Sequence, residues 1–515
     1  KQEVGQLDRI SKMTKAEIVS FANRFFTNGY AAIYKVQGTD TTIHKVDKPK
    51  ITPIPTNNDK HSTFLQTIVN NKVEPIRPVF VDFKKDLTKG MTKKGWPILY
   101  KQNTQDDLFT LYLQIPFGKE SDILPTYAKM YLDYLGTDKM TNAQIKQELY
   151  KLACDYDIGQ TDDETYFKLT GLNENLPKAL ALINDVIDNA KVDKEAYAAA
   201  VDLLIKSQKD KKADQKGNFR ALQNYGMYGL YNSTRNILSE QQLKSMDPQK
   251  LLNVLKNLKN YKQTVLYYGP SSIKDIDNLL TKTFKTAKKF APLPKEKRYT
   301  LQTTPQNEVI IAPYNAKNIY MVQFHNENKE WNPNDAAKIS LFNEYFGGGM
   351  NAIVFQEMRE ARALAYTASA SYHMPNRLGD KDYFNTFIIT QNDKMMDCIA
   401  QFNELLNNMP VRLANFDLAK QNLLKSLAST RTTKFSILST YMNAQKMGLN
   451  CTLSEKIYND LPSVTFDDII NFEKTNMAHK TFKYLILGDE KELDMKALEK
   501  IAPIKRVTTE EIFGY

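Results

Sequence analysis

The sequence predicts an α+β fold built from two homologous units, each a mostly antiparallel sheet with helices packed on one face. The first observation is a repeat. Residues 243–269 and 461–488 each contain a polar cap (Asp247 or Thr465), an amphipathic helix and an apolar strand that ends in glycine. The second observation is a strand of alternating polar and apolar residues ahead of the helical segments in each part of the chain.

The repeats define two complete units, at about 78–290 and about 304–515, offset by roughly 210–220 residues. Their alternating strands are LFTLYLQIPF at 108–117 and NIYMVQFHNE at 318–327. Each unit then has a further strand, at 163–172 and at 382–391. Three more pairs of segments match between the units: 145–152 with 353–361 around a shared Gln-Glu, 175–190 with 392–410, and 196–207 with 416–427.

A third copy of the helix–strand pattern is predicted at 10–38, with Thr14 as the cap and Gly38 after the strand. We therefore interpret residues 1–38 as the tail of a preceding homologous unit. The alternative is an appended helix–strand element that is complete in itself. Residues 39–77 are rich in proline and lysine and are predicted to form an extended linker, and 291–303 a second one.

Composition excludes several classes of protein. The 515 residues are 42% hydrophobic and 25% charged, and no apolar run approaches the ~18 residues of a membrane span. The net charge of +11 is spread along the chain, and its densest run, at 206–220, is interpreted as a solvated helix end and loop. We therefore expect no nucleic-acid partner.

The cysteines and histidines argue against a metal site in this chain. Three cysteines without a CxxC motif predict neither a disulfide framework nor a zinc–thiolate site. They fit a periplasmic, a cytosolic and an organellar setting alike, and of these we favour a bacterial periplasmic or a cytosolic one. No two of the five histidines lie within four residues of each other, so HExxH and HxxEH are both absent. We predict that each is a surface or loop residue; they are His44, His61, His325, His373 and His479.

The stretch FGGGMNAIVFQEMREARALAY at 346–366 carries the candidate site. Its glycines lack the spacing and the lysine of a phosphate loop, and are predicted to form a flexible turn that opens a helix. Arg359 and Tyr366 lie seven residues apart. Either one helix runs through both, or the helix ends near Ala363 and Tyr366 begins a strand. An arginine fork and a tyrosine hydroxyl suit a peptide carbonyl and a developing oxyanion, although an exposed arginine and a half-buried tyrosine with no such role would give the same spacing.

QEMREARALAY resembles the signature of the pitrilysin/insulinase zinc peptidases. The resemblance implies homologous α+β units, four of which form two halves that close like a clam shell around a peptide. One half brings zinc on an HxxEH helix, and the other brings an arginine and a tyrosine seven residues apart. By this resemblance Arg359 and Tyr366 bind substrate and assist the transition state. The glycine turn, Gly347, Gly348 and Gly349 with Asn351, would contact the substrate.

The resemblance also allows a search for zinc ligands in the first complete unit. There the family's zinc helix would precede the Gly-Thr turn at 136–137, and Tyr127, Met130 and Tyr131 stand at its three ligand-motif positions. The downstream glutamate ligand would fall near Leu203. These side chains cannot assemble a zinc site, so we expect no metal in this chain.

The first unit also lacks the arginine–tyrosine pair, because the repeat alignment puts Tyr150 and Asp157 there. We therefore expect this chain to be the non-zinc half of a zinc metallopeptidase and to be inactive alone. Its expected partners are peptide substrates and a zinc-bearing homologous half, in the same gene or as a separate subunit. The alternative is a catalytically inactive family member that binds peptides or acts as a scaffold.

Overall fold

The computed structural model describes residues 3, 5–36, 38, 42, 62–285 and 289–515. The chain divides into two compact units, residues 1–69 and 70–515. Across the described ranges, none of the helices combines the length and the apolar character that a membrane crossing needs.

The described part of the smaller unit contains three helices, and the first two have no buried side chain. They are α1 (Gln6–Lys12), α2 (Lys15–Phe25) and α3 (Thr63–Val69). Thr14 caps α2 in a reciprocal capping box, as predicted. Residues 30–36 form no strand, because a strand needs a hydrogen-bonded neighbour and this segment has none among the described residues. Helix α3 lies inside the predicted extended linker, and much of the rest of that linker lies outside the described residues.

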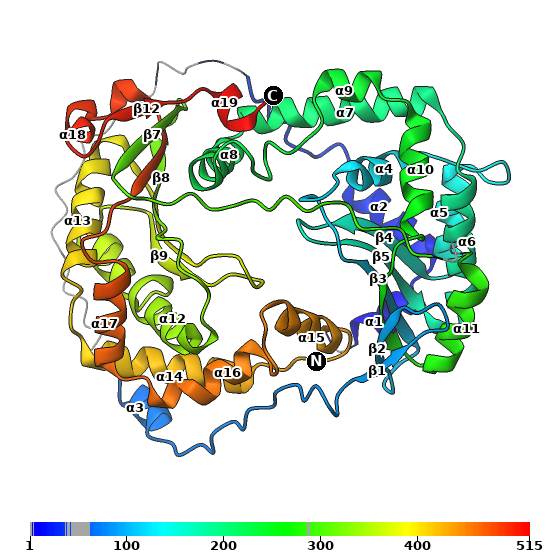
Figure 1. Ribbon diagram of the computed structural model, residues 1–515, viewed down its shortest axis with the longest axis horizontal. Coiled ribbons are helices and arrows are strands. Elements are labelled where there is room, and N and C mark those ends of the chain that lie inside the picture. Colours follow the sequence, from blue (N-terminus) through cyan, green and yellow to red (C-terminus); the bar gives the residue numbers. More distant parts are fainter. Residues whose placement is uncertain (1–2, 4, 37, 39–41, 43–61, 286–288) are drawn as a thin grey trace. The chain divides into compact units, whose positions relative to one another are not determined.

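The larger unit contains two six-stranded mixed sheets (Figure 1). The first has the order β1-β2-β6-β3-β5-β4, and only the β2–β6 pair is parallel. Its strands are β1 (Thr88–Met91), β2 (Pro97–Gln102), β3 (Leu108–Ile115), β4 (Cys154–Gln160), β5 (Thr165–Leu172) and β6 (Thr264–Gly269). The mostly antiparallel sheet predicted from the alternating strands is therefore present.

The second sheet has the order β12-β7-β11-β8-β10-β9, with β7 parallel to both of its neighbours and the other pairs antiparallel. Its strands are β7 (Glu308–Pro313), β8 (Asn318–His325), β9 (Thr367–His373), β10 (Tyr383–Gln391), β11 (Lys483–Gly488) and β12 (Ile504–Arg506). The strands of each sheet fall within one of the two predicted repeats, and the α+β fold class is confirmed.

The helices follow the repeat as well. Those of the first repeat are α4 (Leu124–Leu132), α5 (Asn142–Lys151), α6 (Leu176–Asn189), α7 (Lys194–Ala213), α8 (Gln215–Tyr228), α9 (Glu240–Ser245), α10 (Pro248–Leu258) and α11 (Ile273–Thr283). Those of the second are α12 (Ala336–Phe342), α13 (Met395–Asn407), α14 (Leu413–Ser429), α15 (Ser436–Lys446), α16 (Leu453–Asp460), α17 (Phe466–Asn476), α18 (Met495–Glu499) and α19 (Thr509–Phe513), with π-helical segments η3 (Asn343–Gly348) and η4 (Phe355–Ala361). Asp247 and Thr465 cap α10 and α17, as predicted.

Helices of the same repeat cover one face of each sheet, and a helix of the other repeat covers the opposite face. In the first sheet, Val265 of β6 packs with α6 and α11, whereas the next residue, Leu266, packs with α15. In the second sheet, Ile486 of β11 packs with α13 and α17, whereas its neighbour Leu485 packs with α8. Burial on both faces explains why these strands read as continuous apolar runs rather than as alternating ones.

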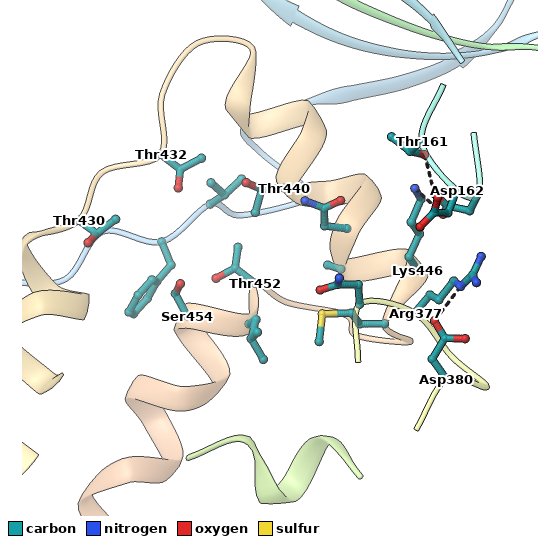
Figure 2. Close-up of a pocket in the computed structure, with 18 of the residues that line it drawn as sticks. Thr161, Asp162, Arg377, Asp380, Thr430, Thr432, Thr440, Lys446, Thr452 and Ser454 are labelled. Carbon is teal, nitrogen blue, oxygen red and sulfur yellow. Dashed lines mark hydrogen bonds and ion pairs between the residues drawn. The ribbon is translucent and has the colours of Figure 1, made fainter. Parts of the chain in front are cut away.

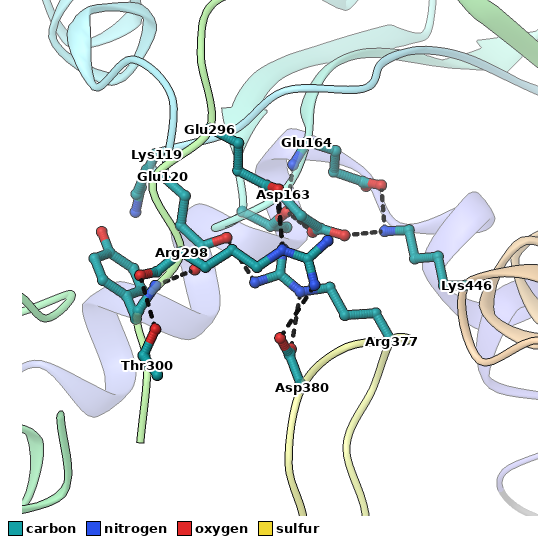
Figure 3. A network of polar contacts seen from close by, with 12 residues as sticks. Lys119, Glu120, Asp163, Glu164, Glu296, Arg298, Thr300, Arg377, Asp380 and Lys446 are labelled. Carbon is teal, nitrogen blue, oxygen red and sulfur yellow. Dashed lines mark hydrogen bonds and ion pairs between the residues drawn. The ribbon is translucent and has the colours of Figure 1, made fainter. Parts of the chain in front are cut away.

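A network of ion pairs joins the two repeats (Figure 3). Arg377, in the β9–β10 loop, donates to Glu120 of the first repeat at 2.6 Å and to Asp380 at 2.8 Å. Its guanidinium also lies 3.4 Å from Glu296, in the segment that connects the repeats. The second carboxylate oxygen of Glu120 accepts a hydrogen bond from the backbone N–H of Tyr299 at 2.7 Å. Three parts of the chain are therefore fixed to one another through one arginine.

Two histidines contradict the prediction that all are surface or loop residues. His325 is the buried last residue of β8, and its Nδ1 lies 2.7 Å from the carbonyl oxygen of Thr481. His373 ends β9 and is partly buried. Burial lowers the pKa of both imidazoles, so neither is predisposed to carry charge. The prediction failed because the alternating strand pattern extends through His325. His479 does lie outside the helices and strands, and His44 and His61 lie outside the described residues.

Glu473 makes the stability of the larger unit depend on pH. Its side chain is buried in α17, burial raises the pKa of its carboxyl to about 7, and Oε1 has no partner among the described residues. The folded state therefore holds this proton more tightly than the unfolded chain, and the stabilisation is lost as pH rises through 7. We expect the free energy of unfolding to fall by about 2 kcal/mol between pH 5.5 and pH 8 through this group. Urea unfolding at both pH values measures it.

The matched variant for that measurement is Glu473→Gln, which removes the titration and keeps the shape. It should reduce the fall and leave the smaller part that belongs to Asp382, whose pKa burial raises to about 6. A pH dependence that is identical in the variant and the native chain would rule out Glu473 as the source.

Candidate functional site

Arg359 and Tyr366 are brought together at the end of η4. The guanidinium carbon of Arg359 lies 5.3 Å from the centre of the Tyr366 ring and 4.9 Å from that of Phe355. Tyr366 is 77% exposed and the Arg359 side chain 44% exposed, so both can contact a ligand. The nearest carboxylate oxygen to the guanidinium is that of Glu360, 3.7 Å from Nε. The arginine therefore contacts two rings, and no hydrogen bond from its guanidinium to another described residue is present.

The chain between the two residues is held by specific contacts. Ala363 adopts a left-handed backbone with φ of 47°, which ends the helical segment. Its carbonyl accepts a hydrogen bond from Lys394 Nζ at 2.7 Å, and the next carbonyl, of Leu364, accepts one from Thr390 Oγ1 at 2.5 Å. The N–H of Tyr366 donates to the carbonyl of Ile389 at 3.2 Å. Of the two predicted alternatives, the helix that ends before Tyr366 is correct.

The first repeat shows what is particular about this connection. Ala153 also has a left-handed backbone, with φ of 48°, but β4 begins at the very next residue, Cys154. Cys154 pairs with Gly171, which lies two residues before the 3-10 turn that begins at Asn173. Tyr366 lies opposite Thr390, which is likewise two residues before the 3-10 turn that begins at Asn392. By this register Tyr366 corresponds to the buried Cys154 rather than to Asp157. The second repeat has two additional residues, Leu364 and Ala365, between its left-handed alanine and the tyrosine.

Glu357 organises the charged residues around the pair and was not singled out from the sequence. Its carboxylate binds Arg362 and also Arg412, which precedes α14. Burial alone would raise the pKa of Glu357, but the hydrogen bonds from the two arginines outweigh it and hold that pKa below its usual range. The sequence signal was the Gln-Glu dipeptide that both repeats share. Because Glu357 is already occupied, Arg359 remains available for a ligand.

The three glycines have different environments. Gly347 and Gly348 are the last residues of η3, so they close a helical segment rather than open one, which corrects the prediction. Gly347 is buried, and a Cβ there would lie 1.8 Å from the carbonyl oxygen of Ala370 in β9. Gly349 has open space around it. Asn351 is exposed, and its carbonyl accepts a hydrogen bond from Asn415 at 3.3 Å.

We expect Gly347→Ala to destabilise the chain by about 2 kcal/mol, because the methyl group must displace the backbone of β9. Gly349→Ala should change the free energy of unfolding by less than about 0.5 kcal/mol, since nothing lies within reach of its methyl group. Chemical unfolding of the two variants makes the comparison. Equal effects would mean that Gly347 does not contact β9 as described.

The degenerate zinc-motif residues belong to the protein core. Tyr127 and Tyr131 are buried in α4; the Tyr127 hydroxyl accepts from the N–H of Leu238, and the Tyr131 hydroxyl donates to the carbonyl of Asp193, both at 2.8 Å. Met130 lies between them and is partly buried. Among the described residues no group of three or more histidine, cysteine or acidic side chains is arranged to hold a metal. Phenol and thioether groups tied into a core do not fit zinc.

A cavity of about 730 Å³ lies elsewhere in the larger unit, and neither Arg359 nor Tyr366 lines it. The exposed pair therefore lies outside this cavity. An exposed surface of this kind suits a binding site whose other side is formed by a second protein surface.

Comparison with known families gives two matches along the chain. A family model described as "Peptidase M16 inactive domain" matches residues 246–423, and one described as "Insulinase (Peptidase family M16)" matches residues 130–235. The chain belongs to the M16 peptidase family. No curated protein sequence matches this M16 chain.

Solved structures share the M16 fold at low identity. The peptidase M16 inactive domain from Pseudomonas fluorescens has a TM-score of 0.60 at 15% identity, over 78% of this chain and 98% of that one. The periplasmic protease PqqL from Escherichia coli has 0.62 at 13%, over 94% and 52%. The ferredoxin protease FusC, solved with Arabidopsis ferredoxin, has 0.61 at 10%, over 93% and 51%. The M16 chain thus spans about half the length of the last two proteins.

Proposed function

We propose that this M16 chain is the non-zinc half of a peptidase that hydrolyses peptides in an enclosed chamber. In this proposal Arg359 and Tyr366 bind the substrate and assist the transition state. The observation that carries it is the contact of the Arg359 guanidinium with the rings of Phe355 and Tyr366, with both members of the pair exposed. A complementary half would supply zinc and the general base.

The chemistry of the pair supports this role. The guanidinium offers several N–H donors in one plane, and its contacts with the two rings restrict where that group can lie. It would donate hydrogen bonds to a carbonyl of the substrate backbone. The Tyr366 hydroxyl would donate a hydrogen bond to the oxygen on which negative charge develops as the peptide carbonyl is attacked. Donors that are oriented before the reaction stabilise that charge without reorganisation.

Residues 10–36 support the presence of a homologous partner unit. Helix α2 and the segment after it repeat the pattern of α10 with β6, yet Ile18, Phe21 and Phe25 of α2 are exposed, whereas Leu251 and Leu255 of α10 are buried. We propose that 1–38 completes a preceding unit. Backbone hydrogen exchange of 30–36 should slow in the presence of that unit, and unchanged exchange would refute the assignment.

Reconstitution tests the function. The chain alone should not hydrolyse a quenched fluorescent peptide, and adding a purified zinc-bearing M16 half should give hydrolysis that a chelator abolishes. A stable complex without hydrolysis would instead favour the peptide-binding or scaffold alternative. That alternative also accommodates the core positions of Tyr127 and Tyr131.

A further inference from the structure

The cavity of about 730 Å³ lies at the junction of the two repeats (Figure 2). Its walls come from the β4–β5 turn and α8 of the first repeat, and from the β9–β10 loop, α15 and the start of α16 of the second. Ligand sites are typically of this volume and are common where structural units meet. Nothing in the proposed roles of Arg359 and Tyr366 uses this cavity.

One end of the cavity is negatively charged. Four carboxylates and two cations line it, which leaves an excess of two negative charges in a chain whose net charge is +11. Most of these groups already have partners: Arg377 binds Glu120 and Asp380, and Lys446 binds Asp163 at 2.9 Å. Few charged groups at this end of the cavity are therefore left without an ion-pair partner.

Asp162 is the unpaired carboxylate at this end. Among the described residues, none donates a hydrogen bond to its side chain and none forms an ion pair with it, although the side chain is exposed to the cavity. Desolvation and the like charge of Asp163 raise the pKa of Asp162, and the charges of Lys119 and Arg377, which do not contact it, oppose that rise only in part. A carboxylate in this condition gains most from a cation that reaches it directly.

The opposite end of the cavity carries hydroxyl groups. Thr430, Thr432, Thr440 and Ser454 lie there, away from Asp162 and Arg377 (Figure 2). A hydroxyl can donate to a carbonyl and accept from an N–H, so a row of them suits a peptide backbone. Phe80 and Leu453 add apolar surface for the methylene groups of a long side chain.

We propose that this cavity binds a basic side chain of a peptide, with the cationic group on the Asp162 carboxylate and the adjoining backbone along the threonine-rich wall. Lysine and arginine reach across such a space, whereas a small cation would leave the hydroxyl wall unused. The site depends only on residues 70–515, and it stands whether or not Arg359 and Tyr366 take part in hydrolysis.

Calorimetry on the full chain tests the proposal with two blocked alanine pentapeptides that differ at the centre, one with lysine and one with norleucine. The lysine peptide should bind at least about tenfold more tightly, equivalent to about 1.4 kcal/mol. Asp162→Asn should abolish that preference, because it removes the charge and breaks no contact. The matched control is Asp155→Asn, which alters an exposed carboxylate on β4 and should keep the preference.

Thr440→Val tests the other wall and should weaken both peptides by a similar factor. The proposal is overturned if the native chain shows no preference for lysine, or if the preference survives Asp162→Asn. Circular dichroism of each variant confirms that it is folded. Because the zinc-bearing half is absent from this measurement, a failed reconstitution of hydrolysis would leave its result unaffected.

Discussion

Replacing Arg377 with alanine should destabilise the larger unit by about 3–5 kcal/mol. Glu120 is 3% exposed and Arg377 is 14% exposed at its side chain, so the substitution leaves a carboxylate buried without its cation. Burial already raises the pKa of Glu120 in spite of the arginine. Without Arg377 the carboxyl would take up a proton or admit water, and either change weakens the junction of the two repeats.

Urea unfolding of the full chain measures this effect, and Arg298→Ala is the matched control. Arg298 also contacts Glu296 and Asp380, but its side chain is 39% exposed, so its loss should cost less than about 1 kcal/mol. Adding Glu120→Gln to Arg377→Ala should restore part of the stability, because the unpaired charge is then gone. If the two arginine variants are equally stable, burial of the Glu120 pair is not what holds the junction.

Local patterns predicted much of this fold because their causes are local. The alternating strands at 108–117 and 318–327 correspond to β3 and β8, and the caps Thr14, Asp247 and Thr465 begin the expected helices. A cap depends on one side chain and an N–H two or three residues away, so the sequence contains all of the information.

The features that the sequence did not reveal depend on residues far apart in the chain. Gly347 is restricted by the Ala370 carbonyl of β9, 23 residues further along the chain, and α8 covers a sheet that belongs to the other repeat. The continuous apolar run around Leu485 was a signal of burial on two faces, but it does not say which helix supplies the second face. The Arg377 network joins three segments that no spacing rule connects.

Spacing and resemblance identified the candidate pair, but they did not identify the hydrogen bonds that hold the chain between its two residues. Lys394 and Thr390 come from the turn at the end of β10 and from β10 itself, and they hold the carbonyls between Arg359 and Tyr366. In an unfolded chain a seven-residue interval fixes no distance between two side chains. The left-handed Ala363 and the end of β10 bring the two side chains into contact in spite of that interval.

The largest effect on catalysis is expected from Arg359→Ala in the reconstituted peptidase, where kcat should fall by about 10²–10³-fold. Tyr366→Phe keeps the ring that stacks on Arg359 and removes only the hydroxyl, so it should lower kcat by about 10²-fold with little change in KM. Arg359→Lys should recover part of the activity, because it keeps the charge but loses the planar donors and the stacking.

Arg362→Ala is the control for these variants, since Arg362 lies in the same segment but is bound to Glu357. It should change kcat by less than about threefold while altering the charge of this surface by the same amount as Arg359→Ala. A mechanism that needs only positive charge and one that needs oriented hydrogen-bond donors therefore predict different effects of the two arginine variants on kcat. If both arginine variants lose activity equally, the surface acts through its positive potential. If only Arg359→Ala does so and Tyr366→Phe follows it, the two side chains act on the reacting carbonyl through the geometry that Ala363 and β10 impose.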